Sequence, residues 1–198
     1  MNGLTLERSY WQRGIEYLAG VDEAGRGPLA GPVVAAAVIF PKEQFIDGVD
    51  DSKKLREKKR DRLFQLIREQ SLSIGIGIVP HDVIDRVNIY QASILAMRKA
   101  LEDLTIPPQF VVADGNSFRH DGCPFENIVD GDAKVFTIAA ASIVAKVTRD
   151  RMMREYHEVY PLYGFARHKG YGTKQHREAI REHGLCEIHR KTFRVKLA

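Results

Sequence analysis

Short apolar segments of strand length recur along the chain and predict a central sheet. Residues 17–22 and 110–113 are brief apolar segments, and residues 33–40 form a continuous apolar run. Residues 71–79 alternate between large apolar side chains and glycine or serine, which is the period of a strand. Residues 127–130 predict one more short strand.

Apolar residues at helical spacing predict helices between and after these strands. In residues 56–70, Leu63 and Ile67 share one face and charged residues occupy most other positions. Thr173 is a suitable N-cap for the last helix, and Gly184 follows its end. The predicted helices span residues 56–70, 89–104, 138–160 and 173–183.

The order of these elements predicts an α/β protein with a mixed central sheet. Strands open the chain, helices and strands then alternate, and helices dominate from about residue 145 onward. Because several strand segments are apolar along their whole length, we expect helices to cover both faces of the sheet.

Composition bounds the class of protein. The chain has 198 residues, of which 44% are hydrophobic, enough for one domain with a small appendage. No apolar run approaches the roughly 18 residues of a membrane helix, and residues 1–14 lack the apolar stretch of a signal peptide. Cys123 and Cys186 are expected to be free thiols. We therefore expect a cytoplasmic protein that inserts in no membrane.

The formal net charge of +4 is unevenly distributed. Basic residues outnumber acidic ones from Lys146 to the end, whereas acidic residues outnumber basic ones before it. This asymmetry is typical of an enzyme that binds a polyanion and also has an acidic metal site. A solvated charged surface is the alternative.

Acidic residues follow several of the predicted strands. Asp22 and Glu23 end the first strand, Asp114 ends the strand at 110–113, and Asp132 follows residues 127–130. Adjacent strand residues point to opposite faces, so Asp22 and Glu23 can share one site only if the strand ends or bulges there. Such a cluster predicts a site for Mg²⁺ or Mn²⁺, with two ions as in phosphodiester hydrolysis. Acids that merely cap turns or helices are the alternative.

Residues 25–30 read Gly-Arg-Gly-Pro-Leu-Ala and formally match the dinucleotide-binding fingerprint. A true fingerprint opens a helix, whereas the segment that follows here has a strand pattern. We interpret Gly25 and Gly27 as parts of a tight loop whose backbone approaches a ligand closely, with Arg26 near a phosphate or ribose. A strand-connecting turn with a surface arginine is the alternative.

Several blocks of residues, taken together, resemble the ribonuclease HII family of bacteria, the type 2 RNase H enzymes. They occur in the family's order and extend over about residues 18–172. The blocks are residues 20–33, 51–55, 114–115, 131–132, 138–150 and 163–171.

The resemblance implies a fold, a reaction and a set of site residues. The fold would be an RNase H-like catalytic domain at 15–160 with a helical, basic C-terminal extension at 161–198. The reaction would be cleavage of RNA/DNA hybrids and of single ribonucleotides embedded in duplex DNA, leaving 3′-hydroxyl and 5′-phosphate ends. The resemblance implies that the metal-binding acids are Asp22, Glu23, Asp114 and Asp132. It also implies that Gly25, Arg26 and Gly27 recognise the ribose through its 2′-hydroxyl, and that Tyr171 stacks on the sugar of the nucleotide 3′ to the ribonucleotide.

Lysines are the candidates for contacts with substrate phosphates. Lys53 and Lys54 lie in a polar loop, Lys146 lies on the long helix, and Lys169 is close to Tyr171 in sequence. For any single lysine, a solvated surface charge remains the alternative.

For two polar residues the sequence leaves two roles open. Asp150 could pair with Lys146 one helical turn away or lie near the metal ions. His168 could assist a proton transfer or make a structural hydrogen bond.

Other features predict no additional ligand or partner. His183, Cys186 and His189 offer three possible zinc ligands without a fourth, so we expect no zinc site. Residues 191–198 lack a glutamine-led clamp-binding peptide, and nothing indicates obligate assembly, so we expect a monomer without a clamp tether.

Three other classes of protein share part of this pattern. A junction resolvase of the same fold would need the acids but not Arg26 or Tyr171. A non-catalytic nucleic-acid binding module would be hindered by clustered acids, and a dinucleotide-dependent enzyme would bind its cofactor. Cleavage of a duplex with one ribonucleotide, compared with an all-DNA duplex, separates these classes from a ribonuclease.

Overall fold

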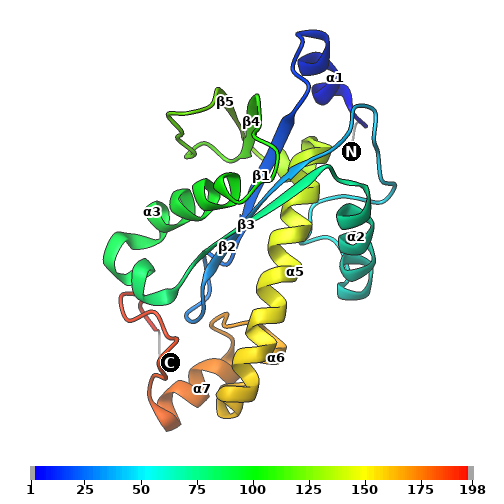
Figure 1. The fold of residues 1–198 in the computed structure, drawn as a ribbon. Coiled ribbons are helices and arrows are strands. Elements are labelled where there is room, and N and C mark those ends of the chain that lie inside the picture. Colours follow the sequence, from blue (N-terminus) through cyan, green and yellow to red (C-terminus); the bar gives the residue numbers. More distant parts are fainter. Residues whose placement is uncertain (1–2, 196–198) are drawn as a thin grey trace.

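The computed structural model describes residues 3–195 and shows a five-stranded mixed sheet with helices on both faces (Figure 1). The strands are β1 (Leu18–Ala24), β2 (Val33–Ile39), β3 (Ser73–Val79), β4 (Phe110–Asp114) and β5 (Phe125–Ile128), and their order in the sheet is β3-β2-β1-β4-β5. β1 pairs with β2 and β2 with β3 in antiparallel fashion, whereas β1–β4 and β4–β5 are parallel. The predicted α/β fold with a mixed sheet is confirmed.

Helices cover the sheet on both sides, and the C-terminal ones gather at one end of the molecule, around the far end of α5 (Figure 1). The helices are α1 (Thr5–Gln12), α2 (Glu57–Gln70), α3 (His81–Glu102), α4 (Gly131–Lys134), α5 (Phe136–Val159), the 3-10 turn η1 (Pro161–Tyr163), α6 (Phe165–His168) and α7 (Lys174–His183). No helix among the described residues is long and apolar enough to cross a membrane.

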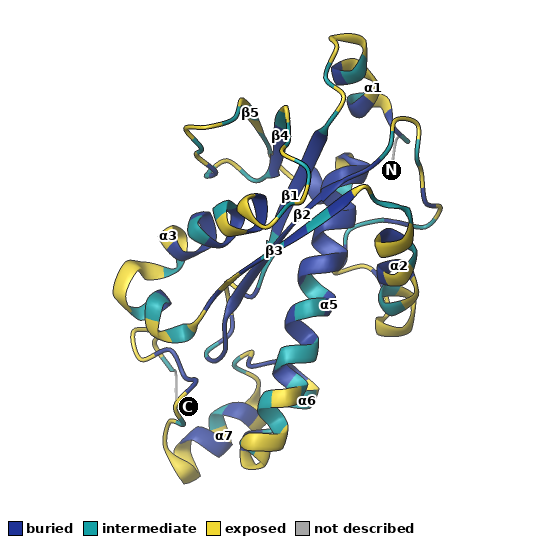
Figure 2. Cartoon of the chain, in the orientation of Figure 1, coloured by how far each residue is buried: buried dark blue, intermediate teal, exposed yellow. Residues whose placement is uncertain are grey.

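The side chains of β2 alternate between two layers of helices. Ala36 and Val38 belong to the core that α2 and α5 cover, whereas Ala35 and Ala37 belong to the core that α3 covers. Every residue of β2 is therefore buried, as the dark blue strand in Figure 2 shows. The apolar run at residues 33–40 reflects burial on both faces, as predicted.

Close approach of α5 to the sheet depends on Gly20 in β1. A Cβ atom at Gly20 would lie 2.3 Å from the carbonyl carbon of Thr137 and 2.6 Å from the amide nitrogen of Ile138. Because both atoms belong to the backbone of α5, only a residue without a side chain fits between the strand and the helix.

The N-terminal helix α1, which the sequence pattern did not predict, closes the start of α5. Glu7 is buried, and its Oε1 accepts hydrogen bonds from the amide of Thr137 at 3.0 Å and from its hydroxyl at 2.8 Å. A carboxylate there complements the exposed amides and the positive end of the helix dipole. Tyr10, also buried, packs against Phe110 of β4.

Two predicted elements differ from the structure. α3 begins at His81, but Asn88, with a φ of 68°, interrupts it; the helix predicted from residue 89 therefore matches the part after the kink, and the part before the kink was missed. The fifth strand is Phe125–Ile128 rather than 127–130. Asp130 instead adopts a left-handed conformation (φ 54°) and leads into α4, so the apolar pattern at 127–130 straddled a turn.

The C-terminal segment packs on the end of α5 and on the loop after β1. Met153 of α5 and Ala30 of that loop share one apolar cluster with Phe165, Ile180 and Ile188. The hydroxyl of Thr173 accepts the amide hydrogen of His176 at 3.2 Å, which confirms its role as N-cap of α7. The division into domains at residues 160 and 161 stays a prediction.

Candidate active site

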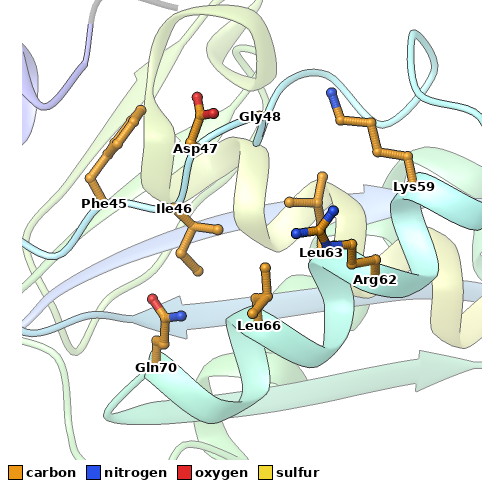
Figure 3. A pocket seen from close by; sticks show the side chains of 9 residues that line it. All are labelled: Phe45, Ile46, Asp47, Gly48, Lys59, Arg62, Leu63, Leu66 and Gln70. Atoms are coloured by element: carbon orange, nitrogen blue, oxygen red, sulfur yellow. The ribbon is translucent and has the colours of Figure 1, made fainter.

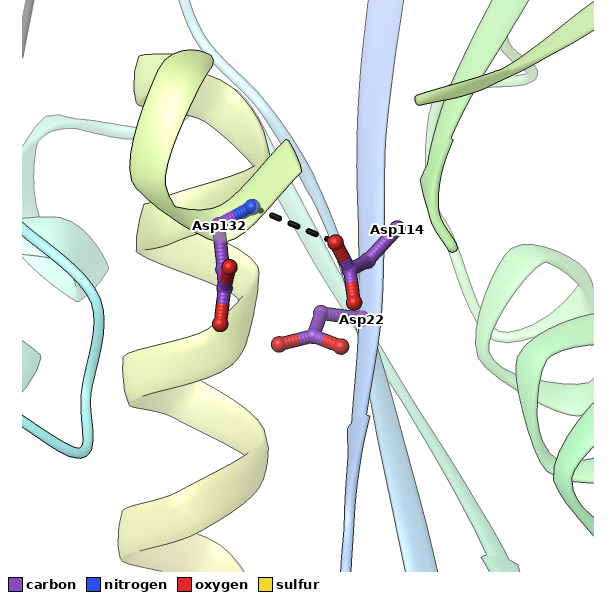
Figure 4. A group of neighbouring side chains, drawn as sticks. All are labelled: Asp22, Asp114 and Asp132. Atoms are coloured by element: carbon purple, nitrogen blue, oxygen red, sulfur yellow. Dashed lines mark hydrogen bonds between the residues drawn. The ribbon is translucent and has the colours of Figure 1, made fainter. Parts of the chain in front are cut away.

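Three aspartates from separate elements meet beside the centre of the sheet (Figure 4). Asp22 lies in β1, Asp114 ends β4, and Asp132 lies in α4; one carboxylate oxygen of each is within 4.8 Å of the others. The parallel pairing of β1 with β4 makes Asp22 and Asp114 neighbours. α4 is held against β4 because the amides of Gly131 and Asp132 donate to Asp114 Oδ1 at 2.7 and 3.3 Å.

Only Asp114 lies where strand-end reasoning placed it. Asp132 sits in a helical turn, and Asp22 lies within β1, which stays in register with β2 through Ala24. The expected strand end or bulge at Asp22 and Glu23 is therefore absent from β1, and the two side chains point to opposite faces.

Asp22 faces α5, where the nearby hydroxyl of Ser142 favours the ionised carboxylate and so opposes the rise in the pKa of Asp22 that burial causes. Glu23 lies outside the group of three aspartates and lines a cavity of about 50 Å³ on the α3 side, together with Arg26 and Asp114. Arg26 donates to Glu23 Oε1 at 3.2 Å. Asp114 borders both groups, so it links Glu23 to the three-aspartate cluster.

Burial and mutual repulsion make this group of acids costly to ionise. Burial, followed by the negative charges of Glu23 and Asp114, raises the pKa of Asp22 well above its ordinary value. Burial and the charge of Asp132 likewise raise the pKa of Asp114. Burial also raises the pKa of Glu23, although Arg26 opposes that shift. Oxygen ligands with an excess of negative charge fit a divalent cation such as Mg²⁺ or Mn²⁺.

The loop before α2 contacts one aspartate of the group and, through Ser52, the α5 residue Ser142. Lys53 donates to Asp132 Oδ2 at 3.0 Å, and this contact raises the pKa of Lys53 although burial opposes it. The hydroxyls of Ser52 and Ser142 lie 2.9 Å apart. Sequence reasoning missed Ser142, although a lone serine in an alanine-rich apolar helix was a usable signal.

Residues 25–30, here called the glycine loop, lie beside Tyr171, which comes from a distant part of the chain. Gly25 has a φ of 102°, and a Cβ at Gly27 would lie 3.5 Å from Tyr171 Cε1. The amide of Leu29 donates to the carbonyl of Gly170 at 2.8 Å, which ties the two segments together. Tyr171 is 45% exposed, so its ring is open to a ligand beside the loop.

The other predicted lysines differ in how free their ammonium groups are. Lys54 is exposed and 3.6 Å from Asp50. Lys146 donates to Asp150 at 2.6 Å, so the ion pair expected for Asp150 is present. Lys169 is buried and its ammonium group donates to a backbone carbonyl.

A chain of neutral histidines lies beneath Tyr171. A carbonyl can only accept, so His176 Nδ1 donates to the carbonyl of Tyr171 and its Nε2 accepts from His189 Nε2, at 3.0 Å each. His189 Nδ1 then accepts from the amide of Cys186 at 2.9 Å. Both ring nitrogens of His168 also contact backbone groups. These contacts match the structural interpretation of His168, and they engage His189 and Cys186 with each other rather than with His183.

The histidine chain predicts acid sensitivity of the C-terminal region. His176 is fully buried, and burial, with the charges that His168 and His189 would carry, lowers the pKa of His176 to about 4. The folded-state pKa lies below the unfolded value of about 6.5, so neutral His176 contributes its full stabilisation above pH 6.5. This contribution to the free energy of unfolding is lost as the pH falls toward 4. We expect urea denaturation to show that His176→Gln reduces the loss of unfolding free energy between pH 7 and pH 4.5 by about 2 kcal/mol.

The matched control is His183→Gln, which removes an exposed histidine of α7. Its pH dependence should follow that of the unmodified protein. A His176→Gln variant with an unchanged pH dependence would contradict the neutral hydrogen-bond chain.

A separate hollow of about 400 Å³ lies between the loop after β2 and α2 (Figure 3). Its floor is apolar, with Ile46, Leu63 and Leu66, and Lys59 and Arg62 lie at its rim. None of the predicted site residues lines this hollow.

The mixed sheet and the carboxylates that meet across β1 and β4 define an RNase H-type nuclease. The ribonuclease H2 of Pyrococcus horikoshii OT3 has the same fold, with a TM-score of 0.76 and 27% identity over 90% of this chain and 94% of that chain. The family profile described as Ribonuclease HII matches residues 19–196. The chain belongs to the ribonuclease HII family, and it is a ribonuclease H enzyme.

Bacterial ribonuclease HII proteins are similar in sequence to this chain over most of their length. A ribonuclease HII of Listeria innocua is 54% identical over 187 residues, covering 94% of this chain and 71% of that protein. A ribonuclease HII of Acholeplasma laidlawii is 51% identical over 193 residues, covering 98% of this chain and 95% of that protein.

Two further solved structures of similar fold contain a protein partner or a metal ion. An RNase HII of Archaeoglobus fulgidus, 25% identical with a TM-score of 0.76 over 91% of this chain and 96% of that chain, was solved in complex with PCNA. Bst-RNase HIII, solved with Mn²⁺, shares only the fold, at 18% identity and a TM-score of 0.67 over 85% of this chain and 63% of that chain. The absence of a clamp-binding peptide at 191–198 stays a prediction, and residues 196–198 lie outside the described part.

Proposed function

We propose that this protein hydrolyses the phosphodiester on the 5′ side of ribonucleotides, in RNA/DNA hybrids and at single ribonucleotides in duplex DNA. The products would carry 3′-hydroxyl and 5′-phosphate ends. The observation that carries the proposal is the position of the Tyr171 ring beside the glycine loop, which lies a few residues along the chain from Asp22. This arrangement combines a surface for a sugar with a group of acids suited to phosphodiester hydrolysis.

The glycine loop would recognise the ribose. Only the 2′-hydroxyl distinguishes RNA from DNA at one nucleotide, and it both donates and accepts hydrogen bonds. Backbone groups of Gly25, Arg26 and Gly27 can satisfy it, because the two glycines leave the backbone uncovered. Tyr171 would stack on the neighbouring sugar. A site built around a hydroxyl can reject the analogue that lacks it by about 10⁴-fold.

The acids would hold two divalent ions, Mg²⁺ or Mn²⁺, through Asp22, Glu23, Asp114 and Asp132. The raised pKa values of Asp22, Glu23 and Asp114 support this assignment, because a divalent ion relieves their repulsion. The Mn²⁺ found with Bst-RNase HIII supports it by analogy of fold. Such ions supply an activated water and stabilise the departing 3′ oxygen.

Lysines around the site would contact the backbone phosphates of the duplex. The side chain of Lys53 is 76% exposed although its ammonium group reaches Asp132, so it can turn toward a phosphate at the reaction centre. Lys54 is exposed beside it, whereas Lys146 and Lys169 would have to exchange a protein partner for a phosphate. These contacts would weaken at high salt and carry little sequence preference.

A 5′-labelled duplex with a single ribonucleotide tests the proposal directly. We expect one product band, ending 5′ to the ribonucleotide, with Mg²⁺ or Mn²⁺ and none with chelator. The all-DNA duplex of the same sequence should stay intact. Cleavage of that all-DNA duplex, or cutting at other positions, would exclude ribose-directed hydrolysis.

The proposed reaction removes ribonucleotides from DNA, which connects it with DNA replication and repair in the cytoplasm. We further propose that the protein acts as a monomer on its nucleic-acid substrate. Its substrate would be held between the basic C-terminal segment and the acidic group on the sheet.

A further inference from the structure

Two buried arginines lie behind the glycine loop. Arg149 comes from α5 and Arg190 from the segment after α7, and each is only 1% exposed. Their guanidinium groups contact backbone carbonyls of residues 25–32 from the protein interior. Arg190 donates to the carbonyls of Gly25, Arg26, Gly31 and Pro32 at 2.6, 2.9, 3.0 and 3.2 Å, and Arg149 donates to those of Pro32, Ala30 and Lys169 at 2.9, 3.1 and 3.0 Å.

These charges are buried without a counter-ion. Neither guanidinium forms an ion pair with a carboxylate within residues 3–195. Burying an unpaired charge is unfavourable, and here only charge-assisted hydrogen bonds to carbonyls offset it. Burial lowers the pKa of Arg190 to about 9 and that of Arg149 to about 10, so both remain protonated at neutral pH. Apolar side chains in this space would leave the same carbonyls without donors, so the arginines have a role besides packing.

The contacts of Arg190 determine which way two backbone amides point. A trans peptide holds its C=O and N–H on opposite sides of one plane. Because the carbonyl of Gly25 points at Arg190, the amide of Arg26 points away from it. The carbonyl of Arg26 also points at Arg190, so the amide of Gly27 points away as well. Neither amide donates to another group in the described part of the chain.

Arg149 limits the shape of the same loop from beneath. A Cβ at Gly25 would lie 2.1 Å from Arg149 Nε, so the loop backbone rests directly on that side chain. Arg190 in turn is held to the loop by its own backbone, since its amide donates to the carbonyl of Leu29 at 2.8 Å. Hydrogen bonds and close packing therefore join the loop to the C-terminal segment.

We propose that Arg190, supported by Arg149, is a positioning residue that fixes the amides of Arg26 and Gly27 toward the 2′-oxygen of the substrate and thereby sets ribose specificity. This inference rests on the proposed reading of the ribose by the glycine loop. A positive charge on the carbonyl side of each peptide also polarises the peptide, which makes its N–H a stronger donor. The C-terminal segment contributes to specificity through this contact, not only through its charge.

The experiment compares two substrates across matched variants. Each duplex carries one target nucleotide, with either a 2′-hydroxyl or a 2′-fluorine, and kcat/KM is measured on both with Mg²⁺. The all-DNA duplex serves as a competitive inhibitor whose Ki reports general duplex binding. The variants are Arg190→Gln, Arg190→Lys and the charge-matched control Lys191→Gln, which changes an exposed neighbour.

Both Arg190 variants are expected to lower kcat/KM on the hydroxyl substrate by about 100-fold, the effect of misplacing a site by about 1 Å. The ratio of kcat/KM between the hydroxyl and fluorine substrates should shrink by about tenfold or more, while Ki for the all-DNA duplex changes by less than about threefold. A merely structural role would lower both rates equally and leave the ratio unchanged. Lys191→Gln should alter rates and Ki together and by little.

Folded Arg190 variants that keep the unmodified ratio would overturn the inference. If Arg190→Gln does not fold, Phe193→Leu replaces it, because the Phe193 ring lies 4.9 Å from the guanidinium and makes none of its hydrogen bonds. A normal ratio in both Phe193→Leu and Arg190→Lys would then also overturn it. If the unmodified protein itself cuts neither duplex at the target nucleotide, the proposed function fails instead, and this outcome is visible before any variant is compared.

Discussion

Replacing Asp22 with asparagine is expected to lower metal-dependent cleavage of a ribonucleotide-containing duplex by about 10³-fold or more. Asp22 lies close to Asp114 and Asp132, and its loss removes one of the proposed negative ligands of the metal ions, an effect worth several kcal/mol. Asparagine keeps the shape and can still accept the amide of Glu23, which donates to Asp22 Oδ1 at 2.7 Å. Duplex binding, measured by fluorescence anisotropy, should change little.

The same substitution should leave the metal-free protein at least as stable. Burial and repulsion from Glu23 and Asp114 raise the pKa of Asp22, so a neutral amide at this position relieves unfavourable charge. In thermal denaturation, Mn²⁺ should raise the Tm of the unmodified protein and have little effect on Asp22→Asn. Activity and metal-free stability are therefore expected to move in opposite directions, which a general folding defect does not produce.

A suitable control is Asp130→Asn. It makes the same change of charge two residues before Asp132, at an exposed position whose positive φ asparagine tolerates. Its cleavage rate should stay within about threefold of the unmodified protein. An Asp22→Asn variant that retains activity would exclude Asp22 from the reaction centre.

Gly20→Ala is expected to destabilise the fold by about 3 kcal/mol, with a fall in Tm of about 10 °C. The added methyl group would lie 2.3 Å from the backbone of Thr137, so α5 would have to move away from β1. This movement would also displace Ser142, which lies near Asp22 on α5. Urea and thermal denaturation measure the loss directly.

Gly122→Ala separates this contact from the general effect of replacing glycine. Its new Cβ would meet only the ring of His120, at 3.2 Å, in a loop where a side chain can move. We expect a change within about 0.5 kcal/mol. If Gly20→Ala were equally mild, the close contact between β1 and α5 would not be essential to the fold.

The positions of the acidic residues show what local sequence patterns can and cannot predict. Asp114 was placed correctly because an apolar run that stops at a turn signal marks a strand end. Asp132 was linked to the right region but to the wrong element, since the strand before it ends earlier and Asp130 takes a left-handed conformation. Glu23 lies on the α3 side of β1 because the strand continues through Ala24, which no local signal showed.

The sequence did not predict most of the side chains that support the site from behind. Glu7 closes the N-terminus of a helix that begins at Phe136, and Arg190 holds a loop that begins at Gly25. Each is one of many charged residues, and neither stands in a distinctive pattern. Their roles arise from burial against distant carbonyls and amides, and sequence spacing contains no information on such contacts.

The sequence alone determined the α/β class, the sheet covered on both faces, the acidic residues and the resemblance to ribonuclease HII. These follow from periodicity, turn residues and ordered motifs, which are properties of short segments. The tertiary structure decided the strand order, which acids share a face, and which arginines lie behind the glycine loop. Those features depend on the packing of segments that are far apart in the chain, where the burial of a charge is set by its neighbours in space rather than in sequence.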